Sequence, residues 1–144
     1  MFGEEKIFGN FKISIDERNR IVLPSSFTHA EKGDKIVIQK DEDGLLISNE
    51  LRIIKIMEEL EEALKCVKSS SEGKIIKEKI DKLCISILAK RECDRQKRII
   101  MPDNLVNTND SNKMMAVGYG KYIKLFTLKK YNQLSNYYIN NYKK

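Results

Sequence analysis

The chain has 144 residues, of which 41% are hydrophobic and 33% are charged, and 27 Lys and Arg against 21 Asp and Glu give a net charge of +6. This length fits one ordinary domain or two very small ones that share a core, and the apolar runs fall far short of the roughly 20 residues of a transmembrane helix. The start of the chain lacks the pattern of a secretory leader, and three cysteines without CxxC spacing favour a reducing cytoplasm over a disulfide framework or a zinc site.

The first fifty residues are predicted to form short β elements. Alternating residues at 12–15 predict a half-buried strand that enters Asp16, and a second strand at 21–23 leaves the following turn. Pro24 ends that second strand and is expected to open a short helix through Phe27.

A β-hairpin is predicted next. Residues 35–39 and 45–48 read as strands that pair across the polar turn 41–44. Gly44 is expected to supply the positive φ that this turn needs.

Three amphipathic helices are also predicted. Leu51, Ile54, Met57, Leu60, Leu64 and Val67 form one apolar stripe, which Asn49 can cap. Ile76, Ile80, Leu83, Ile87 and Leu88 form a second stripe after Ser69–Ser71, in which Ser71 can be the cap. Residues 50–88 therefore read as a helical hairpin, and a further helix runs from Leu128 through Tyr131, Leu134 and Tyr138.

The chain contains an internal repeat. Residues 16–24 read DERNRIVLP and residues 94–102 read DRQKRIIMP, so both copies fit D-x-x-x-R followed by three aliphatic or Met residues and Pro, at an offset of 78. Downstream, 35–38 matches 114–117 and 45–47 matches 124–126, with a slip of one residue, and 117–120 is expected to supply the glycine-bearing turn of the second copy. Two copies are too few for a solenoid, which favours a pseudo-symmetric pair in one core.

The motif suggests a loop that presents an arginine. Asp16 and Asp94 can accept backbone N–H bonds of the turn and so fix its shape, while Arg20 and Arg98 suit phosphate oxygens or the O6/N7 edge of guanine. The alternative is a simple turn-closing Asp–Arg salt bridge, which is common and weak. Residues 90–144 hold 12 Lys and Arg against 4 Asp and Glu, a balance that attracts polyanions without choosing among DNA, RNA and anionic lipid.

The sequence resembles the MraZ family, whose fold is of the AbrB-like swapped-hairpin type. The resemblance rests on Met1-Phe2-Gly3-Glu4, the two motifs and their spacing, Ala89 with Glu92 and Asp94, Val117-Gly118, Leu125-Phe126 and the closing helix. It differs from the usual motif in having Asn19 and Lys97 where Gly precedes the Arg. The usual Trp is absent, and Phe126 and Tyr131 are its expected replacements.

The resemblance implies an α+β fold with a duplicated swapped-hairpin β-barrel core and amphipathic helices after each repeat. It divides a single pseudo-symmetric domain, 1–144, into a first repeat (7–49), a helical hairpin (50–88), a second repeat (89–127) and a C-terminal helix and tail (128–144). It also implies a cytoplasmic, nucleoid-associated transcriptional regulator that binds double-stranded DNA at short tandem repeats upstream of the division and cell-wall gene cluster, as a ring-shaped homo-oligomer.

The expected site residues follow from the motif. The resemblance gives Asp16, Arg20, Asp94 and Arg98. Charge and position add Arg18, Arg95 and Lys97 as DNA contacts, and Asn19, Pro24 and Pro102 are expected to support the turns.

Other functions find less support in the sequence. His29 has no partner arrangement typical of nucleophilic catalysis, and Gly118-Tyr119-Gly120 is a weak nucleotide loop, so we expect no enzyme activity, cofactor, metal or small-molecule substrate. An AbrB-type or antitoxin-like regulator or interaction scaffold with a different operator remains the alternative.

Overall fold

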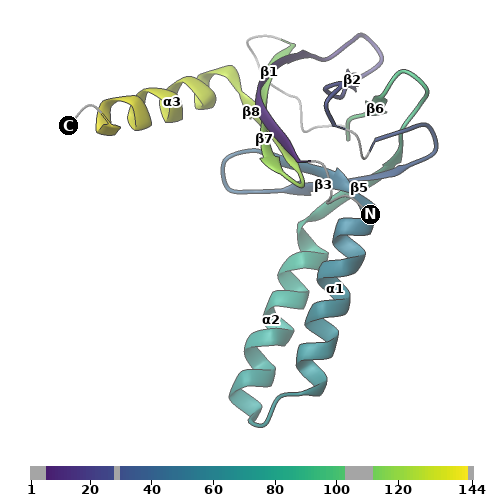
Figure 1. Cartoon of the computed structure of the whole chain (residues 1–144), viewed down its shortest axis with the longest axis vertical. Coiled ribbons are helices and arrows are strands. Elements are labelled where there is room, and N and C mark those ends of the chain that lie inside the picture. The colour runs from purple at the N-terminus through teal and green to yellow at the C-terminus, as the bar shows by residue number, and fades with distance from the viewer. Residues whose placement is uncertain (1–5, 28–29, 103–111, 143–144) are drawn as a thin grey trace.

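The computed structural model describes residues 6–27, 30–102 and 112–142. In these residues the element order is β1 (Ile7–Ser14), β2 (Arg20–Val22), β3 (Lys35–Lys40), β4 (Leu45–Asn49), α1 (Glu50–Lys65), α2 (Ser70–Ser86), β5 (Ile87–Glu92), β6 (Arg98–Ile100), β7 (Lys113–Gly120), β8 (Ile123–Thr127) and α3 (Leu128–Tyr142). The fold is therefore α+β with antiparallel strands and three helices (Figure 1).

The six-stranded sheet is built from both repeats. Its order is β1-β7-β8-β4-β3-β5, so strands of the two repeats pair at three places: β1 with β7, β8 with β4, and β3 with β5. The first strand of each repeat pairs with a strand of the other repeat. Among the described residues, β1 pairs only with β7, and β5 pairs only with β3. Each repeat therefore adds its first strand to the hairpin of the other repeat: β1 lies beside the hairpin β7–β8, and β5 lies beside the hairpin β3–β4.

The predicted barrel does not form in the described residues. β1 and β5 are the two edges of an open sheet, and β2 and β6 pair only with each other as a separate two-stranded ribbon. The ribbon joins the sheet through side chains: Ile21 and Ile99 are fully buried in the core that both repeats share. Packing, and not a continuous hydrogen-bonded ladder, closes this end of the molecule.

From β2 onwards, the equivalent elements of the two halves begin at one offset. β2 and β6, β3 and β7, β4 and β8, and α1 and α3 all begin 78 residues apart. The slip of one residue predicted downstream of the motif was therefore wrong. Buried residues obey the same offset, because Ile36 matches Met114 and Ile47 matches Leu125.

Three predicted local features differ from the structure. Residues 24–27 form a turn and not a helix, with the Phe27 N–H donating to the Pro24 carbonyl at 2.9 Å. Gly44 has no positive φ; glycine is required there because a Cβ would clash with the backbone carbonyl oxygen of Leu125. β7 runs through 117–120, and the turn that follows spans 119–122, where Gly120 has a φ of 90°.

The helical hairpin projects from the sheet as an arm, and α3 leaves the sheet in a different direction (Figure 1). Asn49 caps α1 as predicted, but Ser69 caps α2 instead of Ser71, because its hydroxyl accepts from the N–H of Glu72 three residues on. On α1 the buried residue is Ile53, while Leu51 and Ile54, which belong to the predicted apolar stripe, are exposed. α2 ends at Ser86, so Ile87 and Leu88 belong to β5.

None of the helices in the described part of the chain combines the length and hydropathy needed to cross a membrane.

Candidate functional site

The first motif forms a loop closed by its aspartate. Asp16 Oδ1 accepts the backbone N–H groups of Arg18 and Arg20, both at 2.9 Å. Asp16 Oδ2 accepts from Arg20 Nε at 2.9 Å. One carboxylate therefore shapes the turn with one oxygen and orients the arginine with the other.

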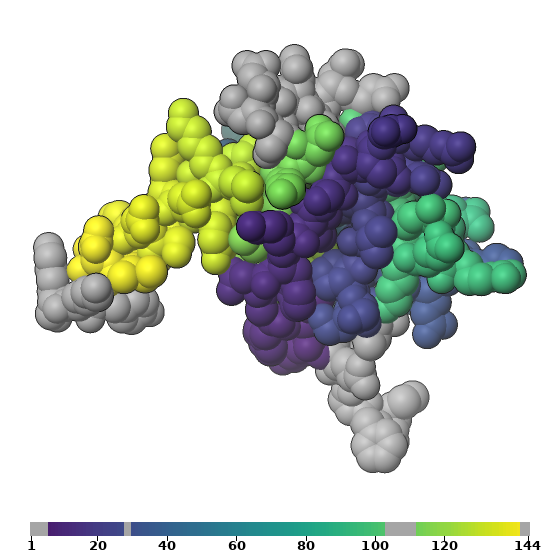
Figure 2. Space-filling model, turned by 90° about the horizontal axis from the view of Figure 1, so that it is seen from above, coloured from purple at the N-terminus to yellow at the C-terminus, as the bar shows by residue number. Residues whose placement is uncertain are grey.

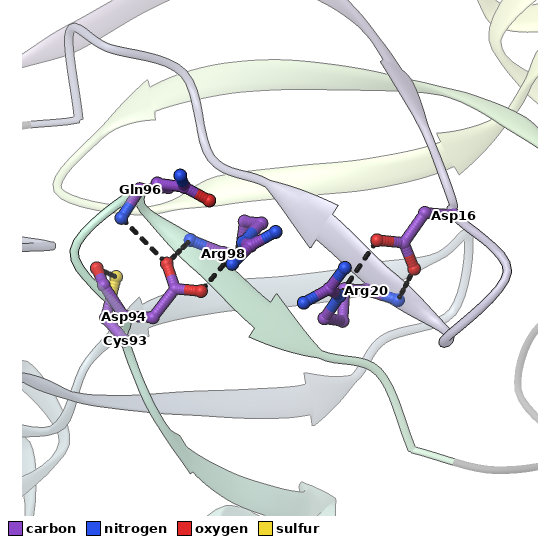
Figure 3. A network of polar contacts seen from close by, with 6 residues as sticks. All are labelled: Asp16, Arg20, Cys93, Asp94, Gln96 and Arg98. Atoms are coloured by element: carbon purple, nitrogen blue, oxygen red, sulfur yellow. Dashed lines mark hydrogen bonds and ion pairs between the residues drawn. The ribbon is translucent and has the colours of Figure 1, made fainter.

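The second motif repeats this geometry (Figure 3). Asp94 Oδ1 accepts the backbone N–H groups of Gln96 at 2.9 Å and Arg98 at 2.8 Å, and Asp94 Oδ2 accepts from Arg98 Nε at 2.7 Å. Although the residues between the Asp and the Arg differ, the same hydrogen bonds form. The Asp and Arg positions of the motif therefore determine the loop conformation, and the residues between them do not.

These bonds favour the ionised carboxylates. Hydrogen bonds from the Arg20 backbone and side chain and from the Arg18 backbone lower the pKa of Asp16 below its usual value. For Asp94 partial burial acts in the opposite direction, but the bonds from Arg98 and Gln96 outweigh it and the pKa is again lowered. Both loops are therefore braced by charged carboxylates at neutral pH.

The residue before each arginine has a left-handed backbone. Asn19 has a φ of 62° and Lys97 a φ of 60°, values that non-glycine residues seldom adopt. Both carbonyls accept from the opposite repeat: the Met101 N–H donates to Asn19 at 2.7 Å, and the Leu23 N–H donates to Lys97 at 2.8 Å. The two loops thus lock each other in place through the residues that precede the buried prolines, Pro24 and Pro102.

The side chains of these left-handed residues make further contacts across the repeats. The Asn19 amide donates to the Met101 carbonyl at 2.6 Å, and Lys97 Nζ donates to the carbonyls of Ser25 and Phe27, both at 3.0 Å. Lys97 was predicted as a DNA contact, but its ammonium is directed to the turn after Pro24. The substitution of Lys for the usual Gly leaves the second loop intact.

The arginines lie on one face of the β2–β6 ribbon. In the antiparallel register Arg20 lies opposite Ile100, and Val22 lies opposite Arg98. Ile21 and Ile99 point to the core, so these four residues share the outer face. In the space-filling view the two repeats meet there, on the side of the molecule opposite to α3 (Figure 2).

The Asp–Arg ion pairs do not occupy the whole guanidinium. Arg20 and Arg98 are bound through Nε, and the side chains are 23% and 29% exposed. Neither makes a hydrogen bond through its Nη groups to any residue within 6–27, 30–102 and 112–142. The expected turn-closing salt bridges are therefore present, and they leave the Nη edge of each guanidinium group available to a ligand.

The remaining predicted cations differ in their setting. Arg18 and Arg95 are exposed at the tips of the two loops. Arg91, which was not among the predicted site residues, lies beside the ribbon, where its Nε donates to the Ile100 carbonyl at 3.1 Å. The signal was present in the repeat, because Arg91 occupies the position of the buried Ile13.

The described residues contain no metal-binding cluster. No group of three or more His, Cys, Asp and Glu side chains is gathered there in a way that could hold a metal ion. Cys66 and Cys84 are exposed, Cys93 is buried, and all three are free. His29 and Met1–Glu4 lie outside the described residues.

Comparison with known proteins points to one family. Over 131 residues the chain is 27% identical to the transcriptional regulator MraZ of Clostridium acetobutylicum, covering 88% of this chain and 87% of that protein. Over 138 residues it is 29% identical to the transcriptional regulator MraZ of Mycoplasma mobile, covering 93% and 88%. The chain is thus similar to two MraZ regulators over most of its length. No family model matches. The two alignments cover 88% and 93% of this chain, so the similarity is not confined to one of its two halves.

Proposed function

We propose that this protein is a sequence-specific DNA-binding transcriptional regulator that reads DNA with its two D-x-x-x-R loops. The observation that carries the proposal is the outer face of the β2–β6 ribbon, where Arg20 and Arg98 are held by Nε and retain unpaired Nη groups among the described residues. The regulator names of the two MraZ relatives agree with it.

The chemistry of this face suits a nucleic acid. An arginine fork that is already oriented loses less conformational freedom on binding phosphate or guanine than a free side chain does. The major groove of B-DNA admits a two-stranded β-ribbon. The exposed Arg18 and Arg95 at the loop tips add positive charge for phosphate contacts.

The finer features of the proposal follow the family resemblance. The exchange of β1 and β5 between halves supports a swapped-hairpin core, with 1–144 as one pseudo-symmetric domain. The targets are short tandem repeats upstream of the division and cell-wall gene cluster, in the cytoplasmic nucleoid. One loop pair gives little affinity, and a ring of subunits raises the effective concentration of loops over tandem sites.

A binding titration tests the proposal. A duplex from upstream of the organism's division cluster is compared with a shuffled duplex at fixed salt, and we expect the first to bind about 10³- to 10⁷-fold more tightly. Arg20→Ala and Arg98→Ala should each weaken binding to the first duplex by about 1–3 kcal/mol. Lys82→Met, at an exposed position on α2, is the control for loss of one positive charge.

Equal affinity for both duplexes would remove the sequence-specific regulator and favour the interaction scaffold. Parental affinity in both arginine variants would leave the motif with a purely structural role.

A further inference from the structure

The outer face of the β2–β6 ribbon also carries two exposed aliphatic side chains. Val22 is 54% exposed and Ile100 is 52% exposed. Each lies directly opposite an arginine and two positions from the other arginine on its own strand. The face is therefore a square in which Arg and β-branched aliphatic residues alternate along the strands and across them.

This square is held rigidly. The residues between the exposed positions, Ile21 and Ile99, are 0% and 1% exposed and anchor the ribbon to the core. The loops at its ends are braced by Asp16 and Asp94. β-Branched side chains have few rotamers, so Val22 and Ile100 present their methyl groups at fixed positions relative to the guanidinium groups.

The mixture of charges and methyl groups indicates what covers the face. A protein partner that covered Val22 and Ile100 would also desolvate the two arginines between them, which is unfavourable without matching anions. A DNA major groove supplies both kinds of partner, because it displays phosphates, guanine acceptors and the 5-methyl group of thymine. An aliphatic side chain on a ribbon in that groove has the thymine methyl as its natural contact.

We infer that Val22 and Ile100 are specificity-determining residues that contact thymine 5-methyl groups in the major groove, while Arg20 and Arg98 contact guanine or phosphate beside them. This inference rests on the proposed function and extends it, because it assigns base selection to side chains other than the motif arginines. The preferred sites then contain thymine at two positions, one for each half of the ribbon.

The test replaces thymine by deoxyuridine, which removes only the methyl group. In the upstream duplex that binds most tightly, each thymine is replaced in turn, and binding by the unmodified protein is measured at fixed salt. In each repeat of the duplex, replacement at two positions should weaken binding by about fourfold, equivalent to the 0.8 kcal/mol or so of one buried methyl-sized group. The protein is unchanged in this arm, so no folding defect can enter.

Protein variants then assign the contacts. Val22→Ala should abolish the deoxyuridine effect at one position and Ile100→Ala at the other, with binding to the thymine duplex reduced severalfold. Ile75→Ala is the matched control, because Ile75 is 55% exposed but lies on α2. It should retain both deoxyuridine effects.

The outcomes separate this inference from the proposed function. Specific binding that does not change with any deoxyuridine replacement would overturn the methyl contacts but would not contradict the proposed regulator function. Deoxyuridine effects that persist in both alanine variants would overturn the assignment to Val22 and Ile100. Failure to distinguish the upstream duplex from shuffled DNA would overturn both proposals.

Discussion

Lys97 tests whether a contact between the repeats offsets backbone strain. Its φ of 60° is unfavourable for a residue with a side chain, by about 1–2 kcal/mol. Its Nζ donates to the carbonyls of Ser25 and Phe27, both at 3.0 Å. Hydrogen bonds to charged groups contribute about 1.5–3 kcal/mol, and because Lys97 is only half-buried we take the lower value for the pair.

Two substitutions separate these effects. Lys97→Met keeps the strain and loses both bonds, so its free energy of unfolding should fall by about 1.5 kcal/mol. Lys97→Gly loses the same bonds but relieves the backbone strain. Glycine also gives the unfolded chain more conformational freedom, which reduces the stability gained by about 0.4–1 kcal/mol. It should therefore be about 0.5–1 kcal/mol more stable than the Met variant.

Urea unfolding followed by circular dichroism measures both differences. Lys82→Met on α2 is the control and should stay within about 0.5 kcal/mol of the parent. If Lys97→Met were as stable as this control, the ammonium–carbonyl contacts would contribute nothing. If Lys97→Gly were the less stable of the pair, the left-handed backbone would not be a source of strain.

Three further predictions concern the second loop, the sheet and α2. Asp94→Asn should be less stable than the parent at neutral pH, and this difference in the free energy of unfolding should shrink as pH falls below about 4. The reason is that a lowered carboxyl pKa stabilises the fold only while the group is ionised. A difference that is constant from pH 7 to pH 3 would contradict the stabilising role of the carboxylate. Gly118→Ala should be destabilising by about 2–4 kcal/mol, because the new Cβ would lie 2.6 Å from the Ile7 carbonyl oxygen between β1 and β7. Gly73→Ala in α2 should instead be stabilising by about 0.5–1 kcal/mol, since its Cβ would meet Val67 at an ordinary 3.6 Å. Unfolding in urea measures all three, and the same sign for both glycine variants would refute the packing argument.

Local patterns in the sequence predicted much of the fold. The 78-residue offset identified the two loops, and the change from alternating to helical periodicity located the three helices. The resemblance implied swapped hairpins, but the strand patterns alone did not reveal that β1 pairs with β7, because two similar halves contain similar strands. Only the register in three dimensions distinguishes the exchanged arrangement from two separate hairpins.

The sequence predicted which residues form the site better than it predicted what each residue contacts. The Asp–Arg braces follow from the motif spacing, since an aspartate four residues before an arginine can reach both the turn N–H groups and the side chain. The partner of Lys97 could not be predicted, because Ser25 and Phe27 lie some 70 residues away along the chain. Likewise the need for Gly44 arises from contact with Leu125 in the other half, which no local rule contains.

The fusion of the two halves in one chain has a consequence for how the protein would lie on DNA. Two identical loops related by a true two-fold axis favour a palindrome. Here the loops differ, because one carries Asn19 and the other Lys97, and Arg91 is present on one side only. A bound chain would therefore have a front and a back and read each site in one direction. Such an asymmetric protein fits direct repeats, which all have the same orientation, better than inverted repeats.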